Sequence, residues 1–278
     1  MRESIQNQRF QVQAAAGDSG FTVTSVRDLQ NRREWIYTDS SFTGERNGDR
    51  SYDEQYGGGM EFLFPSDEKE IYKGKCYADH GVLWRMPYQV KREADTLRAE
   101  GFHAGAGIRA VWNIMLTDSF ILQKLYICNE SAETFPFLIR LHPSFLLERD
   151  TVLNLHEKQI LYEPDGAYCS FKPDSRVADQ IDISDPGTWK AHDLFFHIRQ
   201  KKGEFTITQK DRSLRVEYES ETFPFLTVCS FMKEGKRIGI LEPANVPGIS
   251  LGSAQRFGSL PLFKPGEIRE YTFRLIPQ

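Results

Sequence analysis

The sequence predicts an all-β fold in which large antiparallel sheets pack as a sandwich. Two features of its composition favour strands and turns: aromatic residues make up 13% of the chain, and there are 21 glycines and 13 prolines. The third observation is alternation, because apolar and polar residues alternate along residues 214–219 and 271–275 as they do in half-buried strands. No linker or change of composition divides the chain, so we expect one domain over residues 1–278.

Other segments complete the predicted strands. Residues 120–145 are typical of two long strands joined by a polar hairpin connection at residues 129–133. Residues 88–100 also fit helical spacing but have no clear cap, so we predict a strand there. The string Glu-Thr-Phe-Pro-Phe-Leu occurs at residues 133–138 and again at 221–226. It marks equivalent strand entries in two halves of the fold, or it recurs by coincidence.

Charge and hydropathy exclude several classes of partner. Thirty-five Lys and Arg against 39 Asp and Glu give a formal net charge of -4, which is a poor surface for nucleic acid. No stretch approaches the roughly 20 apolar residues that span a bilayer, and the N-terminus has no apolar signal segment. The four cysteines form no C-x-x-C pair. We therefore predict a cytoplasmic protein with reduced, buried thiols and no membrane partner.

Three short segments place ionisable residues among turn-formers and aromatics, where a pocket is expected. They contain His80 with Arg85, then His142, then Glu242. Each is also typical of a structural residue when taken alone. The two histidines and the glutamate could form a metal-binding facial triad, but the chain has neither H-x-H nor H-E-x-x-H, which favours no metal. It also lacks G-x-S-x-G, P-loop and G-x-G-x-x-G motifs, so nucleotide chemistry is disfavoured.

Taken in order, these segments resemble motifs of the aldose 1-epimerase (galactose mutarotase-like) family. Residues 80–85 look like the first-histidine motif of the family. Residues 142–145 read His-Pro-Ser-Phe and are similar to its His-Pro-Tyr-Phe stretch, with serine in place of tyrosine. Residues 241–243 (Leu-Glu-Pro) precede residues 265–267 (Pro-Gly-Glu), like the closing signature of the family. The resemblance covers about residues 57–275, which is most of the chain.

The resemblance implies a supersandwich of large antiparallel sheets with a sugar site in its concave face. It also implies interconversion of the α and β anomers of a free sugar without cofactor or metal. Glu242 would be the base and His142 the acid, and His80 would line the pocket near the ring oxygen. A nearby carboxylate would help to keep His142 charged.

The chain departs from the family in its sugar-binding residues. Many members carry an arginine in the segment that corresponds to residues 59–65, which has none here; Arg85 or Arg109 is the candidate replacement. Asp193 is the best-placed substrate-binding aspartate and is equally typical of a strand end. Phe231 would take the place of a tryptophan that is common in the family, or belong to the core.

Two alternatives to a mutarotase for free sugars follow from these departures. One is a non-catalytic sugar-binding or sensing protein of the same fold, since a fold does not determine a function. The other is a mutarotase for hexose 6-phosphates, which would require Arg85, Arg109 and Arg140 to gather at the pocket and hold a dianion. The sequence gives no indication of oligomeric state.

Overall fold

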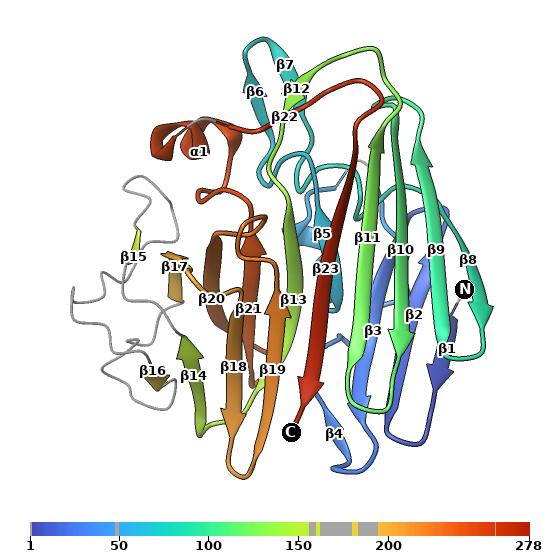
Figure 1. Ribbon diagram of the computed structural model, residues 1–278, viewed down its shortest axis with the longest axis vertical. Coiled ribbons are helices and arrows are strands. Elements are labelled where there is room, and N and C mark those ends of the chain that lie inside the picture. Colours follow the sequence, from blue (N-terminus) through green and yellow to red (C-terminus); the bar gives the residue numbers. More distant parts are fainter. Residues whose placement is uncertain (1, 48–49, 156–159, 162–179, 183–193, 259) are drawn as a thin grey trace.

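The computed structural model describes the chain except for residues 1, 48–49, 156–159, 162–179, 183–193 and 259. Its described part is dominated by two large antiparallel sheets (Figure 1), which confirms the predicted all-β fold class. No helix among the described residues has the length and apolar character needed to cross a membrane.

The larger sheet has ten strands within the described residues. Its order is β1-β2-β3-β5-β13-β21-β20-β17-β15, and β4 pairs with β3. The bounds of these strands are β1 Arg2–Gln6, β2 Phe10–Gly17, β3 Gly20–Asp28, β4 Arg33–Glu34, β5 Met60–Leu63, β13 Arg140–Leu147, β15 Ile160–Leu161, β17 Leu194–Arg199, β20 Phe225–Lys233 and β21 Lys236–Ala244. Strands β13 and β21 lie in the middle of this sheet.

The second sheet has nine strands within the same described ranges. Its order is β16-β14-β18-β19-β23-β11-β10-β9-β8. The bounds are β8 Tyr88–Glu93, β9 Thr96–His103, β10 Ile108–Leu116, β11 Ile121–Asn129, β14 Thr151–Leu155, β16 Gln180–Asp182, β18 Glu204–Gln209, β19 Arg212–Tyr218 and β23 Ile268–Pro277.

Small elements gather at one end of the sheets (Figure 1). They are the pair β6 (Glu70–Tyr72) and β7 (Lys75–Tyr77), the pair β12 (Phe135–Pro136) and β22 (Leu262–Phe263), and the helix α1 (Leu251–Phe257). A single 3-10 turn, η1 (Asp53–Gln55), belongs to the long connection between β4 and β5.

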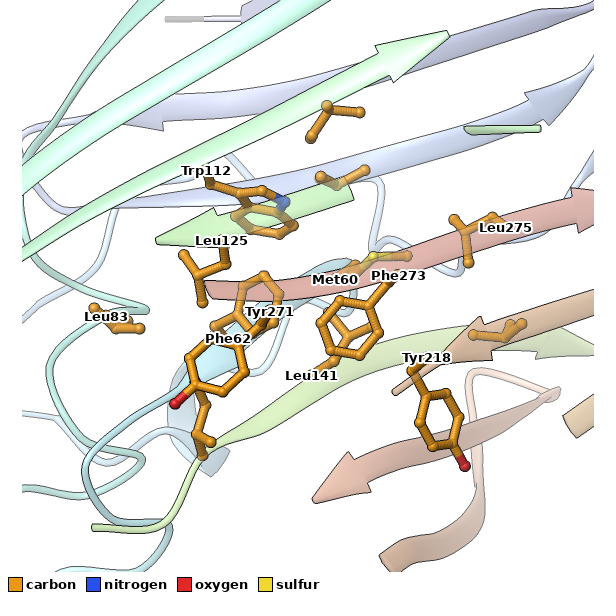
Figure 2. Packing of buried hydrophobic residues seen from close by; sticks show 14 of the residues in the cluster. Met60, Phe62, Leu83, Trp112, Leu125, Leu141, Tyr218, Tyr271, Phe273 and Leu275 are labelled. Carbon is orange, nitrogen blue, oxygen red and sulfur yellow. The ribbon is translucent and has the colours of Figure 1, made fainter. Parts of the chain in front are cut away.

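The core lies between the two sheets. Phe62 of β5 packs against Trp112 of β10 and Phe273 of β23, with ring centroids 4.7 and 5.6 Å apart (Figure 2). Side chains on β10 and β11 alternate between buried and partly exposed along their whole length. Each strand of this sheet therefore gives one face to the core, as the period-two rule requires.

Two predictions about connections need correction. The hairpin expected at residues 129–133 is wrong, because β11 belongs to the second sheet and β13 to the larger one. Asn129 explains the path: its side-chain amide donates to the carbonyls of Glu133 and Phe263 at 2.8 and 3.1 Å, which stabilises a crossing between the sheets. Residues 88–100 do form β structure, but as two strands, β8 and β9, joined by a tight turn.

The repeated hexapeptide lies at the entry to the two strands that flank β21: the first copy ends before β13, and the second ends within β20. Its first copy leads to β13, in which Arg140 pairs with Ala244, and its second copy leads to β20, in which Phe225 pairs with the same Ala244. Arg140 lies seven residues after the start of its copy, whereas Phe225 lies four after the start of the other. The two copies thus lead into strands on either side of β21, but equivalent residues of the copies do not lie at the same level of the sheet. They differ by three residues.

Candidate active site

The two central strands β13 and β21 carry the principal polar side chains of the site. Their antiparallel register places His142 opposite Glu242. Leu141 and Phe145 of β13 belong to the core between the sheets. Because alternate side chains of a strand point to the same face, Arg140 and His142 point away from that core.

His142, Glu242 and Arg140 form a buried group of contacting side chains. Nε2 of His142 lies 3.2 Å from Oε1 of Glu242, and Nη1 of Arg140 donates to Oε2 of the same carboxylate at 2.8 Å. The three side chains are exposed by only 6%, 6% and 1%. Both oxygens of Glu242 have a partner, which holds the carboxylate in one orientation.

The second histidine comes from a tight turn after β7. His80 and Gly81 both have positive φ, at 54° and 71°, a region that glycine adopts readily and other residues seldom do. A Cβ on Gly81 would lie 2.0 Å from the carbonyl oxygen of Phe64, so only glycine fits there. The turn brings the ring of His80 to 6.0 Å from that of His142, measured between centroids.

Two aspartates hold His80 and connect it with Arg140. Nδ1 of His80 lies 2.8 Å from Asp79, and Nε2 lies 3.5 Å from Oδ1 of Asp67. The other oxygen of Asp67 lies 2.9 Å from Nη1 of Arg140. A continuous series of charged contacts therefore runs from Asp79 through His80, Asp67 and Arg140 to Glu242.

Tyr52, just before η1, contacts both histidines. Its hydroxyl lies 3.2 Å from Nδ1 of His142. Its ring stacks on that of His80, with centroids 3.8 Å apart and planes inclined by 5°. Its backbone N–H donates to the carboxylate of Asp79. No signal in the sequence marks this residue, because its neighbours are polar loop residues without periodicity or motif.

Burial moves the pKa values of the central pair in opposite directions. It raises the pKa of Glu242 to about 7, although the neighbouring guanidinium of Arg140 lowers it. It also lowers the pKa of His142 well below the usual value, aided by the positive charges of His80 and Arg140. The expectation that a carboxylate keeps His142 charged is therefore wrong for the free protein, because burial and the neighbouring positive charges disfavour the imidazolium.

The pKa of His80 is shifted in the opposite direction to that of His142. Burial opposes its positive charge, but the hydrogen bond with Asp79 and the negative charges of Asp67 and Asp79 raise its pKa. Burial likewise opposes the charge on Asp79, whose pKa is nevertheless lowered by its hydrogen bonds with His80 and the backbone of Tyr52. The site thus contains one histidine, His80, whose surroundings favour the protonated ring, and another, His142, whose surroundings favour the neutral ring.

These groups line a cavity of about 1110 Å³. Enclosed pockets of about 300–1,000 Å³ accept drug-sized ligands, so a sugar ring has ample room. The polar groups converge at the part of the wall formed by β13, β21 and the His80 turn, whereas Tyr56, Phe231 and Ile240 supply apolar wall. Hydrogen-bonding groups beside apolar surface suit a ligand that has both hydroxyls and C–H faces.

Comparisons with known proteins reveal similarity at the level of structure. No family model matches the chain, and no curated protein matches its sequence. The structure of Slr1438 from Synechocystis sp. PCC 6803 is similar, with a TM-score of 0.76 at 16% identity over 100% of this chain and 96% of that one. A galactose mutarotase-like protein from Lactobacillus casei ATCC 334 has a TM-score of 0.71 at 15% identity, with 100% of both chains covered.

A galactose mutarotase related enzyme from Lactobacillus acidophilus also has a TM-score of 0.71, at 17% identity over 100% of this chain and 97% of that one. The chain has the galactose mutarotase-like fold. The fold that the sequence motifs implied is therefore confirmed, in a chain that has diverged far from these proteins in sequence.

The three arginines that a mutarotase for hexose 6-phosphates would require do not gather on this galactose mutarotase-like fold. Arg85 lines the cavity, and Arg140 is buried between its two carboxylates. Arg109 lies on β10 in the other sheet, where it pairs with Glu130. The structure therefore does not supply the cluster that the hexose 6-phosphate alternative would require. Asp193 lies outside the described residues, and Phe231 lines the cavity.

The segment in which many family members carry an arginine here carries an acid instead. Glu61 on β5 lies opposite His142 in register. Arg46, from the connection before η1, forms a buried ion pair with it, and the hydroxyl of Thr22 donates to the same carboxylate at 2.6 Å. The arginine beside this segment is thus Arg46, which comes from another part of the chain. Its guanidinium lies 5.2 Å from the ring of Trp84.

Two further residues, His197 and Cys76, are structural or lie at the margin of the cavity. His197 is buried, with Nδ1 2.8 Å from the hydroxyl of Thr227, while its Nε2 accepts from the N–H of Gly248 at 3.1 Å. Cys76 is exposed on the cavity wall, so the expectation of buried thiols is wrong for it. Within the described ranges, no group of three or more His, Cys, Asp or Glu side chains is arranged to hold a metal ion.

Proposed function

We propose that the protein is a cofactor-independent aldose 1-epimerase, which interconverts the α and β anomers of a free sugar. The observation that carries the proposal is the contact of 3.2 Å between His142 and Glu242 in the wall of the cavity. O1 and the ring oxygen O5 of a sugar are bonded to the same carbon. An acid and a base that serve these two oxygens must therefore lie close together, as these two side chains do.

Over one cycle of the proposed reaction, the protons that Glu242 and His142 exchange with the sugar balance. The carboxylate of Glu242 takes the proton of the C1 hydroxyl while the C1–O5 bond breaks, and His142 gives a proton to O5. The product is the open-chain aldehyde. After rotation about C1–C2, O5 attacks the other face of C1 and returns its proton to His142, while Glu242 returns its proton to O1. Both residues end in their initial states.

Glu242 and His142 share the proton that this cycle needs, so they titrate as a pair. With one proton between them, the pair contains either a protonated Glu242 beside a neutral His142 or an ionised Glu242 beside an imidazolium. The second form contains both the base and the acid. Because the pKa of Glu242 lies at about 7, raising the pH through 7 removes this proton and abolishes the acid.

Arg140 and His80 supply positive charge around the pair. Arg140 donates to Glu242 and thereby favours the ionised carboxylate that acts as base. His80 lies at the cavity wall between Asp67 and Asp79, where it can donate to a sugar hydroxyl. Each step of general acid or base catalysis typically contributes about 10²–10⁴-fold.

Saturation-transfer NMR tests the proposal by measuring anomer exchange on free hexoses, pentoses and a hexose 6-phosphate. We expect exchange above the buffer rate on a free sugar, a decline as the pH rises through about 7, and loss of at least 100-fold in Glu242→Gln and in His142→Asn. Glu270→Gln on the surface is the matched control and keeps the wild-type rate.

Exchange at the buffer rate, with sugar binding retained, would refute catalysis and leave a sugar-binding protein. Exchange confined to the hexose 6-phosphate would instead identify a phosphosugar mutarotase.

A further inference from the structure

Tyr52 is the one side chain in the described part of the site that contacts both histidines, and nothing in the sequence motifs marks it. It is 2% exposed, and it lies on the cavity wall. Its hydroxyl faces Nδ1 of His142, the ring nitrogen that does not face Glu242. We propose that Tyr52 is the positioning residue of the reaction, whose hydroxyl is the hydrogen-bond partner of His142 before and after its proton moves. This inference rests on the proposed function.

When the pair has lost its shared proton at high pH, the neutral His142 requires a donor at Nδ1. When Glu242 is ionised it can only accept, so Nε2 of His142 carries the hydrogen that faces it. Nδ1 then has a lone pair inside a buried site. The hydroxyl of Tyr52, 3.2 Å away, donates to that lone pair and fixes the ring with Nε2–H turned toward Glu242.

The imidazolium state requires an acceptor at the same position. Both ring nitrogens then carry hydrogen, so Nδ1 must donate, and it keeps this hydrogen when Nε2 gives its proton to O5. A hydroxyl can donate or accept, so Tyr52 serves both states by rotating one O–H bond. Lysine could only donate there and an ionised carboxylate could only accept, whereas phenylalanine could do neither.

Charged groups around Tyr52 keep its hydroxyl protonated. Burial first, and then the charge of Glu61, raise the pKa of Tyr52 well above the usual value, although Arg46 lowers it. Tyr52 is therefore no proton source for the sugar; the transferred proton comes from Nε2 of His142. The other charged and titratable groups that face this tyrosine and His142 are His80, Tyr56, Arg140 and Glu242.

The ring of Tyr52 has a separate role toward His80. The two rings are parallel at 3.8 Å, and an aromatic face attracts a cation. The stack therefore favours the imidazolium form of His80, together with Asp67 and Asp79. Two substitutions separate the roles, because Tyr52→Phe removes only the hydroxyl whereas Tyr52→Leu removes both the hydroxyl and the aromatic face.

The test measures anomer exchange and the ¹⁵N resonances of the histidine rings in the full chain. For Tyr52→Phe we expect kcat to fall about tenfold with KM unchanged, because a buried polar atom loses its partner. The alkaline limb of the rate should move to lower pH by about one unit, since the charge-assisted hydrogen bond that the imidazolium loses is stronger than the one that the neutral ring loses. The Nδ1 resonance of His142 should move, and that of His80 should titrate as in the wild type. In Tyr52→Leu, His80 should also titrate at lower pH.

Tyr218→Phe is the matched control. Tyr218 is a buried tyrosine of the second sheet whose hydroxyl has no hydrogen-bond partner among the described residues, and its loss should change neither rate nor resonances. An unchanged alkaline limb and unchanged Nδ1 resonance in Tyr52→Phe would overturn the inference, even if activity fell. A wild type without exchange activity refutes the proposed function instead, and the Nδ1 resonance then still decides whether Tyr52 is the partner of His142.

Discussion

Replacing Glu242 by glutamine should make the protein more resistant to unfolding as the pH rises. The carboxyl has an ordinary pKa of 4.5 and a folded-state pKa of about 7, so the folded protein holds its proton more tightly than the unfolded chain. The stability that this proton contributes is complete below pH 4.5 and is lost as the pH rises through 7. Glutamine resembles the protonated carboxyl at every pH and still accepts from Arg140.

The size of the effect follows from linkage between proton binding and folding. One unit of pKa corresponds to about 1.4 kcal/mol, so between pH 5 and pH 8 the variant should gain about 2–3 kcal/mol relative to the wild type. Urea denaturation at pH 5, 6, 7 and 8 measures the difference in unfolding free energy by linear extrapolation. Comparing differences across pH cancels any constant effect of the substitution on packing.

Glu270→Gln on the surface is the control. Glu270 is exposed and its hydrogen bond with Lys124 lowers its pKa from 4.5, so the stability linked to its ionisation is lost only below that pH. The stability difference for Glu270→Gln should therefore be nearly flat between pH 5 and pH 8. A stability difference for Glu242→Gln that is flat between pH 5 and pH 8, or that favours the wild type at pH 8, would show that burial does not raise the pKa of Glu242.

Two further substitutions probe the charge balance and the core. Arg140→Met removes the cation that lowers the pKa of Glu242, so the alkaline limb of anomer exchange should move up by on the order of one pH unit; a limb that stays near 7 in the NMR pH profile contradicts this. Trp112→Ala removes a ring 2% exposed that packs on Phe21 and Phe62, and should cost about 3–5 kcal/mol of unfolding free energy in urea. A loss below 1 kcal/mol would mean that this contact between the sheets is not part of the stable core.

The strands with clear alternation are the part of the fold that sequence predicts best. Residues 214–219 and 271–275 lie in or at the end of β19 and in β23, where one face meets the core. The partner of a strand is harder to predict, because pairing is decided by contacts distant in sequence. The polar residues after β11 are equally suited to a hairpin and to the crossing that Asn129 stabilises by reaching Phe263, more than 130 residues away.

The residues of the candidate site also differ in how well the sequence predicts them. His80, His142 and Glu242 each stand in a recognisable local motif, and the structure brings them to one cavity; their chemical roles stay predictions. Tyr52 has no such motif, since its importance arises only when its loop folds over the histidines. The pKa direction of His142 could not be predicted either, because it depends on burial and on Arg140 and His80 together.

The division of the site between sheet and loops has a consequence for how such proteins diversify. Glu242 and His142 belong to adjacent central strands, so the spacing between strands sets their separation. The connection that carries Tyr52 and the turn that carries His80 reach the same cavity from outside the sheet, and connections tolerate insertion and exchange far better than central strands. Evolution, or a directed library confined to these two connections, can therefore alter which molecule is recognised while the paired side chains on the sheet stay in place.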